Sequence, residues 1–350
     1  MLLYISYVII ALIFWFSLNN SGKENSLSAK KAMYFLGAIL VTIAACRSYK
    51  MCTVDIGVYI SDYEQLMYKS FSDYLQWGDE SQGAYALSWL FYHLTGWSVQ
   101  FWFAAVALFY TFSLCYFFRK YSKDYVFCVI LFFAIGLFSF SLNGIKQTVS
   151  MSFAILAWVK TDQRKYVWAV ILYILAFWCH AASSVFLLSF ALYFLRETKI
   201  YYRLLIVFSI AVAFFGPILW SEGIGLLNNE HYESYTNESL GYTATTLIFY
   251  IVLLGSAIYY YKLYSSENNN ESRIMYGNAI MAAVLNSLCV VFSTAFRLSY
   301  YFLPFMIVLL SNCSYQNKKS NMLFKALMLA MILFFFFYTG RDRVYIPFWE

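Results

Sequence analysis

The sequence consists mainly of long apolar stretches separated by short polar segments, and most of the charged residues lie in those segments. A transmembrane α-helix needs about 20 consecutive apolar residues to cross a hydrocarbon core about 30 Å thick. The apolar stretches therefore predict an all-α polytopic membrane protein, with about 12 transmembrane helices in one domain that covers residues 1–350. In chain order, the predicted spans are Leu2–Leu18, Met33–Cys46, Trp97–Phe118, Tyr125–Leu142, Thr148–Val159, Tyr166–Cys179, Ala181–Leu195, Leu204–Trp220, Thr243–Tyr261, Ile274–Thr294, Leu298–Leu310 and Leu327–Tyr338.

One apolar segment, Ala84–Thr95, is too short for an ordinary span. The polar segment before it, Arg47–Gln82, has an acidic excess that suits the outer side, whereas the basic cluster Arg119–Lys123 marks the cytoplasmic side. An odd number of crossings must separate these two segments, and Trp97–Phe118 already supplies one. We therefore expect Ala84–Thr95 to be re-entrant or interfacial; the alternative is that it spans and the amino-terminal assignments are reversed.

Two polar clusters interrupt the apolar pattern on either side of a short basic loop. The first cluster, Asn143–Gln147, contains a lysine and a glutamine, and the second cluster, Phe177–His180, ends in a histidine. The loop between them, Lys160–Lys165, is of the basic type that stays in the cytoplasm. The chain crosses once on each side of this loop, so both clusters are expected on the outer side. Ionisable groups cost about 3 kcal/mol at the bilayer centre, which makes these clusters candidates for function.

Composition supports the membrane assignment and excludes several other classes. The chain is 62% hydrophobic and 12% charged, with a mean hydropathy of +0.62, whereas soluble domains carry about 25% charged residues. It contains no phosphate-binding glycine-rich loop, no cluster of metal ligands and no Gly-x-Ser-x-Gly nucleophile elbow. We therefore expect no metal, no cofactor and no nucleic-acid partner.

Topology gathers the remaining polar candidates on the outer side of the membrane. Asp55 and His180 are the candidates for catalysis, because a carboxylate or an imidazole can take a proton from a hydroxyl group. Lysine and arginine hold phosphates by charge-assisted hydrogen bonds, so the cations are candidates for binding an anionic lipid headgroup. The candidates for substrate binding are Arg47, Lys146, Gln147, Arg297, Tyr300 and Tyr301.

Each of these residues also has a purely structural interpretation. Lys146 can extend to the membrane interface, His180 can satisfy a helix end, and Arg297 can anchor the end of its helix. Asp55 lies in a long polar segment where a solvated carboxylate is common. The functional interpretation does not depend on any single residue. It depends on the fact that all the candidates are predicted on the same, outer side of the membrane.

Four short segments follow one another in a characteristic order: Arg47 with Val54–Tyr59, then Asn143–Gln147, Phe177–Ser183 and Arg297–Phe302. This order resembles the EpsG-like branch of the bacterial polysaccharide polymerases, relatives of the Wzy class that polymerises O-antigen and capsule repeat units. The family usually has arginine where this chain has Lys146. Lysine keeps the positive charge but cannot donate the two parallel hydrogen bonds that a guanidinium gives to one phosphate. The glycine that usually precedes the aspartate is also missing, since Thr53 and Val54 stand there.

The resemblance implies a membrane glycosyltransferase that polymerises oligosaccharide repeat units carried on undecaprenyl diphosphate. It places this activity at the outer face of the bacterial cytoplasmic membrane, with O-antigen, capsule or exopolysaccharide as the product. The implied partners are the lipid-linked glycans, membrane lipid and a regulator of chain length, and no nucleotide-sugar donor is implied. The sugars, the linkage and its stereochemistry are not specified by the sequence.

Two other classes of function remain as alternatives. A lipid-linked oligosaccharide flippase is one, although transporters often show internal repeats and broken helices near the midplane. A membrane acyltransferase that modifies the glycan is the other. Such an enzyme would require a histidine paired with an acidic residue near an acyl carrier.

The predicted topology can be tested by the accessibility of single cysteines. We expect an impermeant thiol reagent to label cysteines in Ser221–Tyr242, and to leave those in Lys160–Lys165 and at Lys318–Lys319 unlabelled in intact cells. Labelling of the Lys160–Lys165 loop would overturn the whole arrangement. The same assay at Asn25 decides whether Ala84–Thr95 spans.

Overall fold

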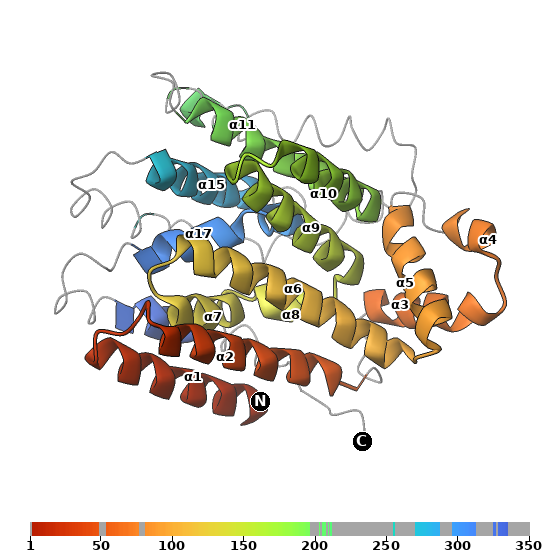
Figure 1. The fold of residues 1–350 in the computed structure, drawn as a ribbon, viewed down its shortest axis with the longest axis horizontal. Coiled ribbons are helices and arrows are strands. Elements are labelled where there is room, and N and C mark those ends of the chain that lie inside the picture. Colours follow the sequence, from red (N-terminus) through yellow and green to blue (C-terminus); the bar gives the residue numbers. More distant parts are fainter. Residues whose placement is uncertain are drawn as a thin grey trace. The chain divides into compact units, whose positions relative to one another are not determined.

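The computed structural model describes residues 2–48, 54–76, 81–196, 270–287 and 296–312, together with residues 203, 205–207, 209, 211, 255, 325–326 and 328–334. All regular secondary structure in these ranges is helical, which confirms the predicted all-α class for this part of the chain (Figure 1). The chain divides into two compact units, Met1–Ser184 with Asn317–Glu350 and Val185–Gln316. The predicted outer loop Ser221–Tyr242 and the basic pair Lys318–Lys319 lie outside the described residues.

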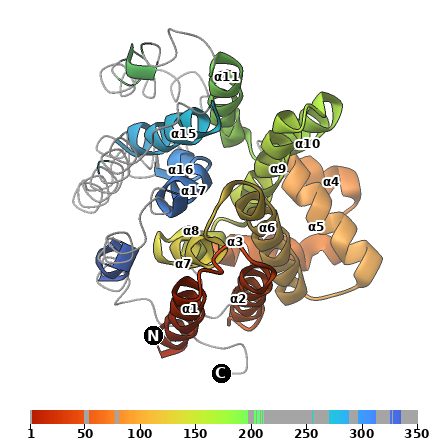
Figure 2. The same ribbon diagram turned by 60° about the vertical axis from the view of Figure 1, so that its left-hand side comes forward.

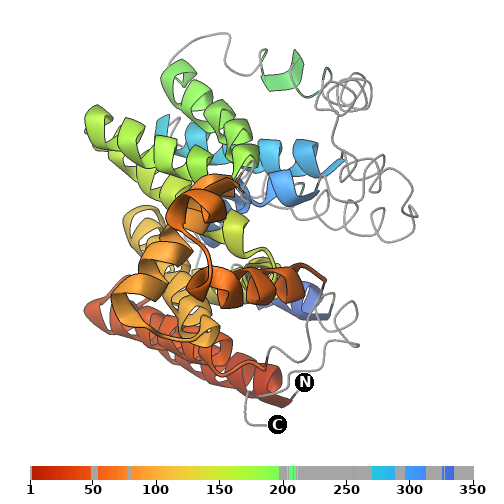
Figure 3. The same cartoon turned by 90° about the vertical axis from the view of Figure 1, so that its right-hand side faces the viewer.

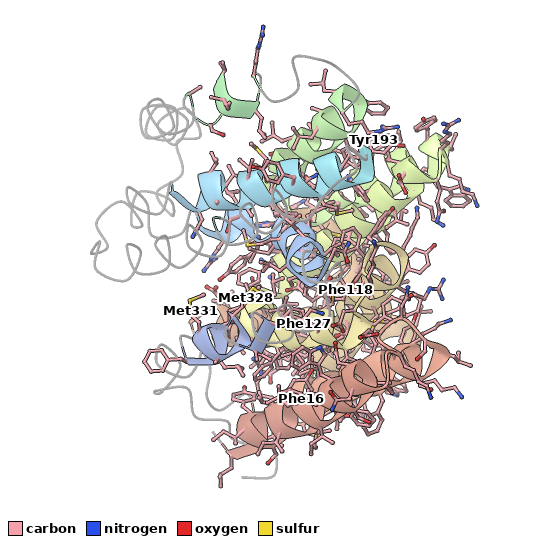
Figure 4. All side chains as sticks on the ribbon, turned by 90° about the vertical axis from the view of Figure 1, so that its left-hand side faces the viewer. Phe16, Phe118, Phe127, Tyr193, Met328 and Met331 are labelled. Carbon is pink, nitrogen blue, oxygen red and sulfur yellow. The ribbon has the colours of Figure 1, made fainter. Side chains whose placement is uncertain are left out.

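The first unit is a bundle in which α2, α6 and α7 pack side by side, with α1 against α2 and α7 (Figure 1, Figure 2). Phe118 and Phe127 are fully buried and belong to the interior of this packing (Figure 4). The helices of the unit are α1 (Leu2–Asn20), α2 (Leu27–Ala45), α3 (Val54–Glu64), η1 (Gln65–Met67), α4 (Phe71–Gln76), α5 (Gln82–Thr95), α6 (Val99–Tyr121), α7 (Tyr125–Ala134), α8 (Leu137–Ser141), α9 (Ile145–Asp162) and α10 (Tyr166–Cys179).

The described helices of the second unit pack around α15. The short 3₁₀ helix η3 (Ala181–Phe186) precedes the unit's first α-helix in sequence. The α-helices α11, α16 and α17 each contact α15. Their bounds are α11 (Leu187–Leu195), α15 (Asn270–Ser287), α16 (Phe296–Ser299) and α17 (Leu303–Asn312).

Within the described residues, three helices are long and apolar enough to cross a membrane, namely α1, α2 and α6. Each begins or ends within a few residues of a predicted span. The other apolar helices are shorter, so the count of about 12 spans stays a prediction. On α1, the side chains of Leu2, Ile9 and Ile13 are exposed, as expected for a helix that faces lipid.

Two predicted spans are not continuous α-helices. The segment predicted as Tyr125–Leu142 is divided into α7 and α8, because the chain turns at Gly136, whose φ angle is 91°. Glycine adopts this left-handed conformation without steric cost and commonly ends helices. The segment predicted as Ala181–Leu195 begins with η3 and becomes α-helical only at Leu187. Hydropathy alone does not show either interruption, because both segments remain apolar throughout.

At one end of the first unit, α3, α4 and α5 lie over the ends of α6, α9 and α10 (Figure 3). A shared apolar cluster holds these helices together; its buried members are Ile56, Tyr63, Leu66, Tyr74, Ala84, Tyr85, Val99, Phe103, Val106, Ile145, Val149 and Cys179. Helix α5 has 14 residues and runs across the end of α6 rather than along it (Figure 1). At about 1.5 Å per residue it is shorter than the hydrocarbon core, but so is α10, a predicted span of the same 14 residues, so the re-entrant or interfacial placement of α5 stays a prediction.

A buried ion pair fastens the carboxyl-terminal part of the first unit to the start of α7. The Asp124 carboxylate accepts a hydrogen bond from the Lys325 ammonium at 2.5 Å and another from the Trp15 indole at 3.0 Å. Asp124 also caps α7, because its side chain accepts from the backbone N–H of Phe127. The Asp124 and Lys325 side chains are only 2% and 5% exposed, so each charge depends on the other for compensation.

We expect Asp124→Ala to lower the free energy of unfolding by about 3–5 kcal/mol, because it leaves the Lys325 ammonium buried and unpaired. Lys325→Met should have a similar effect, whereas the double variant Asp124→Leu/Lys325→Met should regain much of the loss. A matched control is Lys120→Met, which removes the exposed Lys120–Asp162 pair and should cost at most about 1 kcal/mol. Denaturation in detergent measures these values. Purely additive losses in the double variant would contradict this account.

Candidate functional site

The polar residues of α3 lie along one face of the helix. Asp55, Tyr59 and Asp62 are separated by four and three residues, a spacing that brings side chains to the same side of an α-helix. Tyr59 and Asp62 line a pocket at this end of the first unit. The face of α3 therefore presents a carboxylate to the site.

A hydrogen-bonded chain connects α9, α5 and α3 at the pocket. The Lys146 ammonium, in the first turn of α9, donates to the Tyr85 hydroxyl at 2.7 Å. The Tyr85 hydroxyl in turn donates to the Asp62 carboxylate at 2.6 Å. The ammonium also lies 4.2 Å from the centre of the Tyr85 ring and 5.1 Å from that of Tyr59, at distances typical of cation–π contacts. These contacts fix Lys146 at the edge of the pocket.

Tyr85 stays protonated in this arrangement. Burial raises the pKa of the Tyr85 phenol well above its ordinary value, and the hydrogen bond to Asp62 raises this pKa further. The phenol therefore remains a neutral hydroxyl that accepts from Lys146 and donates to Asp62. It keeps the ammonium and the carboxylate at a fixed separation.

The walls of the pocket are mainly aromatic. The pocket is open to the surroundings and small: a water-sized sphere can occupy about 20 Å³ of it, which is room for one water molecule or one hydroxyl group. The lining residues are Tyr59, Asp62, Tyr63, Tyr74, Ala84, Tyr85, Ser88, Trp102, Ile145 and Lys146. The Tyr63 hydroxyl donates to the backbone carbonyl of Trp97, and the Tyr74 hydroxyl forms a hydrogen bond with the Ser88 hydroxyl at 3.1 Å. These two hydrogen bonds hold both rings in place.

His180 lies at the end of α10, close to the start of α5. Its ring nitrogen Nδ1 is 3.4 Å from the Ser81 hydroxyl, and its backbone N–H donates to the carbonyl of Ala176. The antiparallel helices α9 and α10 are tied by a hydrogen bond from Ser150 to the same carbonyl, so their polar ends lie on the same side of the hairpin. His180 is nevertheless not among the residues that line the pocket.

The other candidates in the first unit do not line the pocket. The Arg47 guanidinium lies 6.0 Å from the centre of the Phe103 ring, and its backbone carbonyl accepts from Gln100. Gln147 is only 3% exposed. Asp55 is partly exposed in the first turn of α3.

The remaining predicted binding residues belong to the second unit. Arg297 lies in α16, and Tyr300 follows it in a turn; both are partly exposed. Tyr301 is 1% exposed and packs against Phe186, as a core residue does. Whether these three residues take part in substrate binding stays a prediction.

Sequence reasoning missed two members of the hydrogen-bonded chain, Asp62 and Tyr85. Asp62 was detectable, because it lies seven residues after Asp55 and three after Tyr59 on a helix face. Tyr85 gave no such signal, since it lies within an apolar segment where tyrosine is common. Among the described residues, no group of His, Cys, Asp and Glu is arranged to hold a metal ion.

Comparison with known families gives one match that covers nearly the whole chain. The model of the EpsG family matches residues 30–348. No curated protein and no solved structure matches the chain.

The contact between α5 and α10 predicts the effect of a single added methyl group. A Cβ at Gly83 would lie 2.8 Å from the backbone carbonyl carbon of Trp178, so Gly83→Ala must push α5 away from α10. We expect a loss of about 1–3 kcal/mol in stability, measured by unfolding in detergent. Gly57→Ala is the control, because no atom of the described residues, apart from the backbone of α3 itself, lies within 4 Å of the position that an added Cβ would take; it should be neutral or stabilise α3 by up to about 1 kcal/mol. Equal stability of the two variants would contradict the close packing.

Proposed function

The chain belongs to the EpsG family, whose members are Wzy-type polysaccharide polymerases, and from this premise we propose its reaction and substrate. The protein polymerises oligosaccharide repeat units carried on undecaprenyl diphosphate. It works at the outer face of the bacterial cytoplasmic membrane and contributes to O-antigen, capsule or exopolysaccharide. One lipid-linked glycan is transferred from its carrier to the sugar terminus of another, without a nucleotide-sugar donor.

The observation that carries this proposal is the position of Lys146. Its ammonium lies in the first turn of α9, where the unpaired backbone N–H groups add a positive potential, and at the edge of a pocket. A cation at a helix amino terminus favours a phosphate group. The anionic part of a lipid-linked glycan is its diphosphate, so we assign this group to Lys146.

The same contact would assist the chemical step. As the acceptor hydroxyl attacks the anomeric carbon of the donor sugar, the bond to the diphosphate breaks and negative charge accumulates on the leaving oxygen. Lys146 stabilises that charge more in the transition state than in the ground state, which lowers the barrier. Arg297 is a second candidate for contact with the diphosphate, and Arg47 and Gln147 are candidates for contacts with the glycan.

The outer location is supported by the charges at the two ends of α9. At the end opposite Lys146, Lys120 forms an ion pair with Asp162, and the basic loop Lys160–Lys165 follows. Basic loops of this kind stay in the cytoplasm. The pocket lies at the other end of the helix, so we assign it to the outer side.

One observation favours a second candidate, a flippase for lipid-linked oligosaccharides. The break between α7 and α8 at Gly136 is of the kind that transporters use near their substrate sites. The two functions differ in what a deletion strain contains. Loss of a polymerase leaves single repeat units on the cell surface, whereas loss of a flippase leaves none.

We expect deletion of the gene to leave glycans of one repeat unit, seen on gels, and the wild-type protein to restore long chains. Lys146→Arg should also restore them, because it keeps the charge, whereas Lys146→Met should reduce polymer at least about 10²-fold. Lys165→Met, at the other end of the α9–α10 hairpin, is the control and should be fully active. Full-length polymer from Lys146→Met at normal protein levels would refute the assignment of Lys146. Absence of any glycan in the deletion strain would favour the flippase.

A further inference from the structure

The structure points to a role for Asp62 that the sequence did not indicate. We infer that this pocket receives the attacking hydroxyl of the acceptor sugar, and that Asp62 takes its proton. This inference rests on the proposed polymerase function and names the acceptor site within it. It assigns the proton acceptor to Asp62 rather than to His180 or Asp55.

The geometry of the carboxylate is the first argument. One oxygen of Asp62, Oδ2, accepts from Tyr85, whereas its other oxygen forms no hydrogen bond with any residue that the structure describes. Asp62 is partly exposed and lines the pocket. A carboxylate held by one oxygen, with the other available at a pocket, has the arrangement of a general base.

The shape of the pocket is the second argument. The pocket has room for a single hydroxyl group, with about 20 Å³ available to a water-sized sphere, but not for a whole sugar ring. The rings of Tyr59 and Trp102 line it and are partly exposed. Flat aromatic faces with a few fixed polar groups are typical of sites that orient a small molecule. The sugar ring would rest against these rings while one hydroxyl group enters beside Asp62.

The charges at the pocket also suit this role of Asp62. The proton acceptor and the cation for the leaving group are linked through one phenol, since Tyr85 accepts from Lys146 and donates to Asp62. Because Tyr85 remains protonated, it does not compete for the proton of the acceptor hydroxyl. Tyr85 is therefore a positioning residue, and it places the negative carboxylate and the positive ammonium on two sides of the reacting atoms.

The step balances with these groups alone. The oxygen of the acceptor hydroxyl forms a bond to the anomeric carbon, and its proton passes to Asp62. The bond from that carbon to the diphosphate breaks, and its electron pair stays on the diphosphate beside Lys146. Asp62 then returns its proton to water. His180 and Asp55 do not line the pocket, and the His180 ring contacts Ser81 instead.

The test uses the full-length protein in proteoliposomes, with the lipid-linked single repeat unit extracted from the deletion strain as the substrate. We expect Asp62→Asn to lower the polymerisation rate at least about 10²-fold, because asparagine can accept from Tyr85 but cannot take a proton. Glu64→Gln is the matched control, since Glu64 is exposed on the same helix and does not line the pocket, and it should be fully active. Tyr85→Phe should lower the rate less than Asp62→Asn.

Chemical rescue distinguishes a base from a structural residue. Sodium formate should restore turnover to Asp62→Ala, which leaves space for a small carboxylate, and should not restore it to Asp62→Asn. A wild-type rate in Asp62→Asn would overturn the inference, as would the absence of rescue in an Asp62→Ala protein whose unfolding midpoint matches wild type. Failure of the wild-type protein to polymerise the substrate would instead refute the proposed function.

Discussion

The need to compensate the charge of Lys146 governs the arrangement of the whole pocket end of the first unit. An ammonium in the first turn of a helix opposes the helix dipole, so it is stable there only with nearby negative or aromatic groups. Tyr85 and Tyr59 supply ring faces, and Asp62 supplies the negative charge through the Tyr85 hydroxyl. This requirement brings α3 and α5 onto the end of α9. The contacts of Lys146 therefore do two things: they hold α3 and α5 against α9, and they position the candidate reactive groups.

Polar contacts at the opposite end keep the bundle in register. The buried pair of Asp124 and Lys325 joins α7 to the carboxyl-terminal part of the unit, and Lys120 pairs with Asp162 where α6 and α9 end. Between these ends, α9 is packed along α6 and α10. A helix held at both ends can present Lys146 at a fixed position, which is what stabilisation of a developing charge requires.

The sequence predicted much of this arrangement because apolar length and basic loops are strong signals. These two signals predict the helical class and the short segment Ala84–Thr95. They also predict that the two polar clusters lie on the same side of the membrane. The break at Gly136 was missed because glycine does not interrupt an apolar run. Tyr85 was missed because its partners come from distant helices, and the burial of Tyr301 depends on packing against Phe186. Contacts between helices are set by tertiary packing, which a single sequence does not encode as a local pattern.

The most direct test of the account is a structure of the protein in a lipid nanodisc with undecaprenyl diphosphate bound. We expect a phosphate oxygen within hydrogen-bond distance of the Lys146 ammonium, about 2.7–3.2 Å, with the pocket beside Asp62 left open for an acceptor. A diphosphate bound elsewhere, with the contact between Lys146 and Tyr85 unchanged, would contradict it. In that case, the chain from Lys146 to Asp62 would serve only to hold the helices together.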